Sequence, residues 1–500
     1  MKILLIYPRY PVTFWSFDHV LKIIGKKAAF PPLGLLTVAS LLPKKWEKKL
    51  VDMNIDELSA DNIEWADMIF VSAMIIQKDS AKEVIERVRN LGKKVVAGGP
   101  LFTTGWKKFG KKVDHLVLGE AEEIFSLFLK DLKKGKLKKI YSSKVFPNLK
   151  RRSVIPDYSL IDINKYNSMC IQYSRGCPFN CEFCDIAILN GRVPRFKTKG
   201  QIIKEFDNLY NLGWRGGIFF VDDNFIGNRA ILKKEILPAI WEWQKKKRQP
   251  FLFITQASIN LADDKELIRQ MVKVGFTTVF IGIETPNPDS LAECMKIQNK
   301  NRDLIDSVKL LQNEGLEVQG GFIVGFDHDT ASIFKRQIEF IQKSGIVTAM
   351  VGLLTALPET KLYKRLQDTG RLIKETTGSN MATEVNFVPK MKKETLVKGY
   401  RDILNTIYSP KEYYKRIKTF ASEFRPTFRK TSLRMRTTYI RALIASFWLL
   451  GIKNEGRGYF WKLVFWSIFR KPKVLPQIIG FSVVGIHFRR LYGDKNESWN

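Results

Sequence analysis

The stretch Tyr173-Ser174-Arg175-Gly176-Cys177-Pro178-Phe179-Asn180-Cys181-Glu182-Phe183-Cys184-Asp185 organises this 500-residue chain. It places three thiols at spacings of four and three residues, in a loop rich in Gly, Pro and Asn. Three thiolates this close can hold three irons of a four-iron cluster and leave the fourth iron open. Because a vacant iron can bind a small molecule, the spacing predicts a catalytic 4Fe-4S cluster on Cys177, Cys181 and Cys184.

Two other interpretations of these cysteines are weaker. Structural zinc requires four Cys or His ligands, usually as two separated pairs. The remaining cysteines, Cys170 and Cys294, stand alone, and the chain has four histidines. Cysteines that merely pack in a core would not need a loop of this composition. Since two isolated cysteines do not make a disulfide framework, the sequence indicates a reducing compartment.

The spacing Cys-x3-Cys-x2-Cys, with Phe183 before the third cysteine, resembles the signature of the radical S-adenosylmethionine (SAM) enzymes. The resemblance implies that the open iron chelates SAM and that Phe183 lies by the adenine. In that family an electron from the cluster breaks a carbon–sulfur bond of SAM and gives the 5′-deoxyadenosyl radical. A reductase, flavodoxin or ferredoxin is therefore an implied partner as electron donor.

Composition bounds the partners and the compartment. The length predicts two or three domains, and the apolar fraction of 45% is that of a globular protein. The net charge of +33 indicates an anionic partner, either nucleic acid or a membrane face, unless it reflects many solvated lysines. The first apolar run ends at Pro8 and Arg9, too early for a signal peptide, so we expect a buried strand and a cytoplasmic protein.

Residues 1–150 alternate short apolar runs with amphipathic stretches. The predicted strands are Lys2–Tyr7, Lys49–Met53, Met68–Ser72, Lys94–Ala97 and His115–Leu118, with helices such as Leu33–Leu42 and Ser80–Leu91 between them. This alternation predicts an α/β fold with a doubly wound, Rossmann-like parallel sheet. Ligands of such sheets bind beyond the carboxyl ends of the strands, where Gly98, Gly99 and Glu120 fall. Tight turns alone would also explain the glycines.

This region resembles the cobalamin (B12)-binding domain that precedes many radical SAM domains. The resemblance implies that Gly98, Gly99 and Glu120 face the corrin. The usual Asp-x-His-x-x-Gly loop, whose histidine coordinates cobalt, is absent. The histidines lie in other contexts: His19, His115, His328 and His487. We favour cobalamin bound without a lower histidine ligand over a domain that has lost the cofactor.

After a linker at residues 151–165, residues 166–400 form a second strand–helix repeat. The predicted strands are one ending at Tyr173, then Gly217–Val221, Leu252–Gln256, Thr278–Ile283, Val318–Val324 and Thr348–Leu353. Six such units predict a partial (β/α)6 barrel, open on one side, of the kind found in radical SAM proteins. The chemistry of parallel barrels lies at the carboxyl ends of their strands.

Polar side chains follow three of these strands. By resemblance, Asp222, Asp223 and Asn224 take the place of the motif that receives the amino group of SAM, with a helix-capping Asx turn as the alternative. The polar pair Gln256 and Ser258 is placed to meet the ribose hydroxyls or the carboxylate of SAM.

The strand that ends at Ile283 carries two further predicted contacts. Gly282 is expected to allow close approach of the adenosine. Glu284 either contacts SAM or pairs with an inserted Arg or Lys.

Residues 1 to about 420 resemble the branch of cobalamin-type radical SAM proteins that contains the hopanoid C-2 methylase. The matching stretches include Phe70–Ile75, Gly98–Phe102, Phe220–Asn228 and Ser344–Leu353. The resemblance implies methyl transfer to an unactivated carbon of a hopanoid or isoprenoid-like lipid. The alternatives are coupling or cyclisation of lipid carbons without methyl transfer, and RNA modification. The sequence names neither the attacked carbon nor the residue that positions the substrate.

Residues 401–500 form a basic, aromatic-rich helical extension. Between Lys411 and Leu491 there are eighteen Lys or Arg residues and three acids, a net charge of +15. The longest uncharged run, Val474–Phe488, has fifteen residues, whereas a spanning helix needs about twenty. We therefore expect this extension to lie on the anionic inner face of the membrane as a peripheral contact. Packing against the barrel is the main alternative, and nucleic acid is disfavoured.

Overall fold

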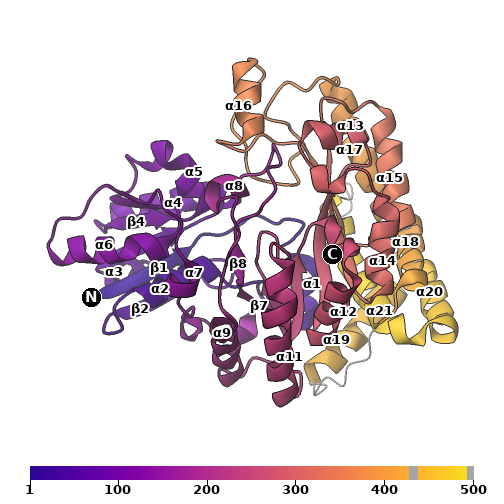
Figure 1. Cartoon of the computed structure of the whole chain (residues 1–500), viewed down its shortest axis with the longest axis horizontal. Coiled ribbons are helices and arrows are strands. Elements are labelled where there is room, and N and C mark those ends of the chain that lie inside the picture. Colours follow the sequence, from indigo (N-terminus) through magenta and orange to yellow (C-terminus); the bar gives the residue numbers. More distant parts are fainter. Residues whose placement is uncertain (427–436, 493–500) are drawn as a thin grey trace.

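The N-terminal region of the chain is a six-stranded parallel sheet, seen in a computed structural model that describes residues 1–426 and 437–492 (Figure 1). The strands follow the order β2-β1-β3-β4-β5-β6. They are β1 (Lys2–Tyr7), β2 (Glu47–Asp52), β3 (Met68–Ser72), β4 (Val95–Gly98), β5 (His115–Leu118) and β6 (Ile140–Ser142). Because β1 pairs with both β2 and β3, the order reverses there, and a ligand crevice is expected beyond the carboxyl ends.

Helices cover both faces of this sheet. Successive residues of β1 point to opposite faces, so Ile3 and Leu5 join one buried cluster while Leu4 and Ile6 join another. The first cluster lies under α2 (Leu33–Leu41) and α6 (Ala121–Lys133), and the second under α3 (Ala60–Trp65), α4 (Lys78–Asn90) and α5 (Pro100–Phe109). The predicted doubly wound fold is confirmed. The sequence missed β6, because three residues flanked by lysines give no apolar run.

The second sheet is also parallel and has six strands, in the order β14-β13-β12-β11-β10-β7. They are β7 (Ser168–Ile171), β10 (Gly217–Phe220), β11 (Leu252–Gln256), β12 (Phe276–Glu284), β13 (Glu317–Val324) and β14 (Ala349–Leu353). No pairing within the described residues joins β14 to β7, so the barrel is open there, as predicted. Its outer helices are α9 (Lys199–Asn211), α11 (Leu237–Lys246), α12 (Lys265–Val274), α14 (Leu304–Asn313) and α15 (Ser332–Ser344).

The segment between β1 and α2 ties the two sheets together. Ala28 forms a β-bridge with Tyr166, just before β7. Trp15 donates a hydrogen bond from its indole Nε1 to the Met350 sulfur at 3.1 Å, and its ring lies 5.4 Å from that of Phe280. Side chains of this N-terminal segment therefore contact the strands of the barrel.

The C-terminal residues are helical: α16 (Lys361–Asp368), α17 (Lys393–Tyr408), α18 (Pro410–Glu423), α19 (Thr437–Trp448), α20 (Arg457–Arg470) and α21 (Leu475–Tyr492). Figure 1 shows α18 beside α14 and α15, on the outside of the barrel, and α20 and α21 pack in turn against α18. Tyr413 donates a hydrogen bond to the Phe481 carbonyl at 2.7 Å, and the Phe488 ring stacks on Phe14 at 4.4 Å. Much of the aromatic content of the extension is therefore buried in the main core.

None of the helices in the described part of the chain combines the length and the apolar content that crossing a bilayer requires.

Candidate functional site

The cysteine loop, residues 176–194, begins at the carboxyl end of β7. An antiparallel ribbon of β8 (Ser174–Arg175) and β9 (Arg195–Phe196) closes its base. Gly176 has a φ of +94°, and a Cβ there would lie 3.0 Å from three backbone carbonyl oxygens. Because glycine alone tolerates this approach, Gly176 sets the path of the chain into Cys177.

The three cysteines of the loop are partly buried free thiols. Among residues 1–426 and 437–492, no three His, Cys, Asp or Glu side chains are grouped so as to hold a metal ion. A four-iron cluster does not require that convergence, because each thiolate binds a different iron. Burial raises the pKa of Cys184 to about 12, so its thiolate needs a positive partner such as iron. The chemistry of Cys177, Cys181 and Cys184 therefore fits the predicted cluster.

A buried ion pair lies beside these thiols. Lys296 Nζ is 2.6 Å from Glu284 Oε1, and both side chains are about nine-tenths buried. Burial lowers the pKa of Lys296, but Glu284, Cys181 and Cys184 outweigh that effect and raise it, so the ammonium stays charged. The sequence raised an inserted Lys as a partner of Glu284 but did not identify Lys296.

The ion pair also accounts for Gly282. A Cβ at this position would collide with Glu284 Oε1 and lie 2.8 Å from Lys296 Nζ. Glu284 itself has a φ of +64°, a strained value for a residue with a side chain, which aims its carboxylate at Lys296. In the structure the space beside Gly282 is filled by this pair, whereas the sequence predicted that the space would admit adenosine.

The two aspartates after β10 brace the base of the cysteine loop. Asp222 is fully buried and accepts hydrogen bonds from the Tyr173 amide at 3.1 Å and the Ser174 hydroxyl at 2.5 Å. Asp223 accepts from the Gly176 amide at 2.7 Å. Burial raises the pKa of Asp222 to about 7. Both carboxylates, predicted to receive the amino group of SAM, thus have the loop backbone as partners.

Asn224, Gln256 and Ser258 lie together at the neighbouring strand ends. Asn224 Nδ2 donates to Ser258 Oγ at 3.2 Å, and Ser258 Oγ donates to Asn260 Oδ1 at 2.6 Å. Gln256 is partly buried, and its backbone carbonyl accepts from the Phe225 amide at 2.9 Å. The structure therefore groups these predicted SAM contacts at the carboxyl edge of the barrel.

The far side of the cysteine loop is held by α16. Arg365 binds both carboxylate oxygens of Glu182, at 2.6 and 2.9 Å, and also Asp327 at 2.9 Å. The Leu362 amide donates to the Glu182 carbonyl at 3.0 Å. Next to Glu182, Phe183 is partly buried with its ring 6.4 Å from Phe326. Sequence reasoning missed Arg365, because nothing local marks an arginine so distant in the chain.

The residues predicted to face the corrin occupy the carboxyl edge of the first sheet. Gly98 ends β4, and Gly99 has a φ of +90° with no room for a Cβ, which would lie 2.6 Å from Ser72 Oγ. Glu120 follows β5, but its carboxylate points to Arg175 at 2.6 Å and Arg195 at 2.5 Å. The two glycines thus leave the backbone open to close approach, whereas Glu120 joins the first sheet to the β8–β9 ribbon of the cysteine loop.

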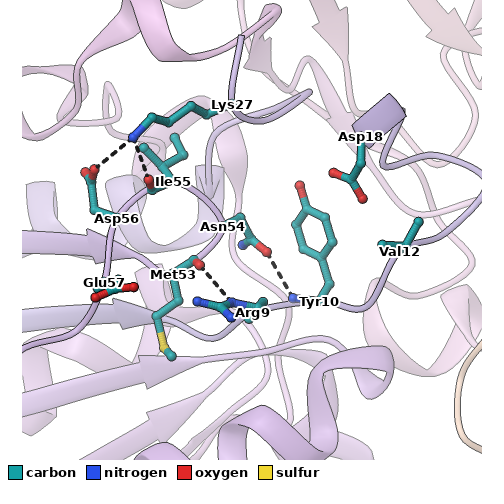
Figure 2. Close-up of a pocket in the computed structure, with 10 residues that line it drawn as sticks. All are labelled: Arg9, Tyr10, Val12, Asp18, Lys27, Met53, Asn54, Ile55, Asp56 and Glu57. Atoms are coloured by element: carbon teal, nitrogen blue, oxygen red, sulfur yellow. Dashed lines mark hydrogen bonds and ion pairs between the residues drawn. The ribbon is translucent and has the colours of Figure 1, made fainter. Parts of the chain in front are cut away.

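Figure 2 shows a polar pocket of about 350 Å³ beyond the ends of β1 and β2. Its charged and amide groups bind one another: Arg9 Nε donates to the Met53 carbonyl at 3.3 Å, and Lys27 Nζ donates to the Ile55 carbonyl at 3.1 Å. The Tyr10 amide donates to the Asn54 side chain at 3.0 Å. These contacts join the segment between β1 and α2 to the turn that follows β2.

Three families match successive parts of the chain. Residues 26–129 match the B12 binding domain, residues 171–341 the Radical SAM superfamily, and residues 360–498 a domain of unknown function, DUF4070. The matches follow the order of the two sheets and the C-terminal helices.

Similar proteins cover nearly the whole chain. It is 38% identical to an uncharacterized methyltransferase of Synechocystis sp., over 98% of this chain and 91% of that protein. It is 33% identical to the hopanoid C-2 methylase of Rhodopseudomonas palustris, over 94% of this chain and 90% of that protein. The structure resembles the cobalamin-dependent SAM radical enzyme OxsB with a TM-score of 0.66, at 16% identity, over 99% of this chain and 80% of that one.

Proposed function

Because the chain belongs to the cobalamin-binding radical SAM family that includes the hopanoid C-2 methylase, we propose that it methylates an unactivated carbon of a hopanoid or isoprenoid-like lipid. The chain is a radical SAM C-methyltransferase that uses a 4Fe-4S cluster, SAM and cobalamin. The observation that carries the lipid assignment is the similarity to the hopanoid methylase over nine-tenths of both chains.

The protein's own side chains take distinct roles in this proposal. Cys177, Cys181 and Cys184 hold the cluster, and Lys296 offsets its negative charge. When bound, the cluster and SAM supply the radical that removes hydrogen, and the corrin supplies the methyl group. A reductase, flavodoxin or ferredoxin supplies the electron.

SAM is proposed to lie over the ends of β10, β11 and β12. Phe183 then faces the adenine, and Asn224, Gln256 and Ser258 supply polar contacts to the ribose or the carboxylate. Asp222, Asp223 and Glu284 support SAM indirectly, because each binds the cysteine loop or Lys296. Gly282 leaves room for that last pair.

Cobalamin is proposed to lie on the backbone at Gly98 and Gly99, with no histidine as lower ligand. Glu120 borders this site through its arginine partners. The hypothesis of coupling or cyclisation with an empty first domain loses support, because that domain matches a B12-binding family and the similar proteins are methyltransferases. The same findings disfavour RNA modification.

Contact with the cytoplasmic face of a membrane fits a lipid substrate. Large apolar side chains are exposed on the C-terminal helices, including Trp448 at 55% and Phe469 at 81%. An apolar groove of about 660 Å³ is lined by Lys22, Ile23, Ile444, Ala445, Trp448 and Leu449. Apolar side chains flanked by the +15 charge of this region suit an anionic bilayer surface.

Lipid mass spectrometry tests the substrate assignment. The chain is expressed in a hopanoid-producing host that lacks it, beside a Cys181→Ala variant that cannot hold the cluster. We expect hopanoids or isoprenoid lipids heavier by one methylene with the intact chain and none with the variant. Unchanged lipids, in cells where the purified protein carries cluster and cobalamin, would overturn the assignment.

Vesicle flotation tests the membrane contact. The intact protein is expected to float with vesicles rich in anionic lipid and less with neutral ones. An Ile444→Ser/Trp448→Ser variant should bind about tenfold more weakly, because two exposed apolar side chains are lost. Leu127→Ser, on α6, is the matched control, since Leu127 is 45% exposed but lies outside the C-terminal helices. Equal binding of all three proteins would contradict the assignment.

A further inference from the structure

Four charged side chains join the loop that carries the cysteines to the turn after β5. We call Glu120, Glu122, Arg175 and Arg195 the clasp. Arg175 Nη1 donates to Glu120 Oε2 at 2.6 Å, and its Nη2 donates to Glu122 Oε1 at 2.6 Å. Arg195 donates to Glu120 Oε1 and Oε2 at 2.5 and 3.1 Å. The Glu120 carboxylate, just after β5 of the first sheet, thus binds two guanidinium groups of the β8–β9 ribbon.

The two arginines are held side by side before they meet the glutamates. Arg175 and Arg195 are direct partners in the ribbon of β8 and β9, which closes the cysteine loop. Arg175 Nε also donates to Gln172 Oε1 at 2.8 Å, and Arg195 Nη2 donates to the Asn190 carbonyl at 2.8 Å. Arg175 is therefore held at the start of the cysteine loop, two residues before Cys177, and Arg195 is bound to Asn190 within that loop.

The glutamates are equally fixed to the first sheet. Gly119 follows β5 with a φ of +90°, Glu120 is the next residue, and Glu122 lies in the first turn of α6. The exposed fractions of the four clasp side chains lie between 3% and 15%. Removing one partner of an ion pair this deeply buried destabilises the protein, because the other charge is left buried and unpaired. Removing one partner of a surface ion pair has little effect on stability.

We propose that the clasp sets the distance and orientation between the cluster site and the corrin site, with Arg175 and Glu120 as positioning residues. This inference rests on the family's two cofactors but not on the identity of the lipid. Methyl transfer requires both cofactors to address one carbon, so a displacement of about 1 Å would matter. Arg175 lies two residues before Cys177, and Glu120 lies in the turn after β5, the strand that pairs with Gly98 of β4. The clasp therefore links the cysteine loop to the edge of the first sheet that carries Gly98 and Gly99.

Pulsed electron paramagnetic resonance tests the clasp without any substrate. The holoprotein is prepared with the cluster reduced and with cob(II)alamin, so that both sites are paramagnetic and their dipolar coupling reports their separation. Glu120→Gln and Arg175→Lys are each expected to shift and broaden the distance distribution. Glu314→Gln, which breaks the exposed pair with Arg269 on α14 and α12, should leave it unchanged.

A double variant tests whether Glu120 and Arg195 act as a pair. If Glu120 acts through Arg195, Glu120→Gln/Arg195→Gln should disturb the distance distribution no more than Glu120→Gln alone. The proposal is overturned if single variants that retain iron and cobalamin give the same distribution as the intact protein. It is also overturned if Glu120→Gln and Arg175→Lys both lose a cofactor, because the clasp would then serve cofactor loading. A missing lipid product, by contrast, bears on the substrate alone.

Discussion

At several positions of the site, the neighbouring groups decide which amino acid can fit. Gly282 is a glycine because the Glu284–Lys296 pair occupies the place of its side chain. Asp222 is an aspartate because three donors at the base of the cysteine loop, the amides of Tyr173 and Ser174 and the Ser174 hydroxyl, need a buried acceptor. Gly282 thus leaves space for an ion pair, and Asp222 holds the base of the cysteine loop in position.

Replacing Gly282 with alanine should therefore disrupt the ion pair. We expect Gly282→Ala to lower the free energy of unfolding by about 1–3 kcal/mol, because the added methyl group meets buried charged atoms. Gly480→Ala is the control, since a Cβ there meets no atom within 4 Å and alanine favours the helix. Thermal unfolding followed by circular dichroism measures both. Equal midpoints for the two variants would contradict the prediction.

Glu317 predicts a pH dependence of stability. Its carboxylate, at the start of β13, accepts from Gln319 Nε2 at 2.9 Å, and burial raises its pKa to about 7. A raised carboxyl pKa means that the folded state keeps a proton that the unfolded state releases, so stability falls as the pH rises from about 4.5 to 7. Glu317→Gln should remove this fall in stability, because glutamine carries no ionisable proton.

The Glu317→Gln variant should be more stable than the intact protein at pH 8, by up to about 3 kcal/mol, and similar to it at pH 4.5. Urea unfolding at both pH values measures the difference. A difference that does not depend on pH would show that Glu317 stays ionised in the folded protein.

At the scale of elements, helix α16 acts as a strap over the cysteine loop. It supplies Arg365 to Glu182 in a bidentate pair and the Leu362 amide to the Glu182 carbonyl. Arg371, just after this helix, binds Asp327 at 2.7 Å and so holds the strap to the end of β13. The C-terminal region therefore contributes to the order of a loop that precedes it by nearly two hundred residues.

Loosening this strap should expose the cluster. We expect Arg365→Gln to lose iron several-fold faster than the intact protein in the presence of a ferrous chelator, because Glu182 loses its partner. Lys364→Gln, on the exposed face of the same helix, is the matched control. The decay of visible absorbance under anaerobic conditions gives the rates. Identical rates of iron loss for all three proteins would show that α16 does not protect the cluster.

At the scale of the whole molecule, one core joins the two ends of the chain. Phe488 on α21 stacks on Phe14 and also packs 4.8 Å from the Tyr408 ring. His487 binds the Thr13 carbonyl at 3.1 Å, and burial lowers the pKa of this histidine to about 4, so it stays neutral. Helix α21 is therefore packed into the main core, while α19 and α20 carry exposed apolar residues that the proposed membrane contact would use.

Phe488→Ala tests this integration. We expect a loss of about 3–5 kcal/mol in the free energy of unfolding, because the substitution empties a fully buried site. Phe469→Ala should change stability by about 0.5 kcal/mol or less, since that ring is 81% exposed. Thermal midpoints of the purified proteins decide the matter. A loss of stability as small as that of Phe469→Ala would show that α21 does not contribute to the stability of the core.

Local pattern was enough to predict both parallel sheets and the cysteine loop. Strand periodicity and cysteine spacing are short-range properties, so most strand ends lie within two residues of their predicted places. Packing of the C-terminal extension against the barrel was the alternative and not the favoured prediction, because an apolar helix has the same sequence pattern whether a membrane or a core covers it.

The sequence by itself determined the chemistry of the centre: three thiols at a spacing that leaves an iron open, at the end of a strand in a parallel barrel. Only the tertiary structure decided what surrounds that centre. Lys296, Arg365 and the clasp are partners that lie from 12 to 183 residues away from the groups they bind. Each is an ordinary charged residue in its local sequence, and it acquires a role only when folding removes water and leaves one opposite charge within reach.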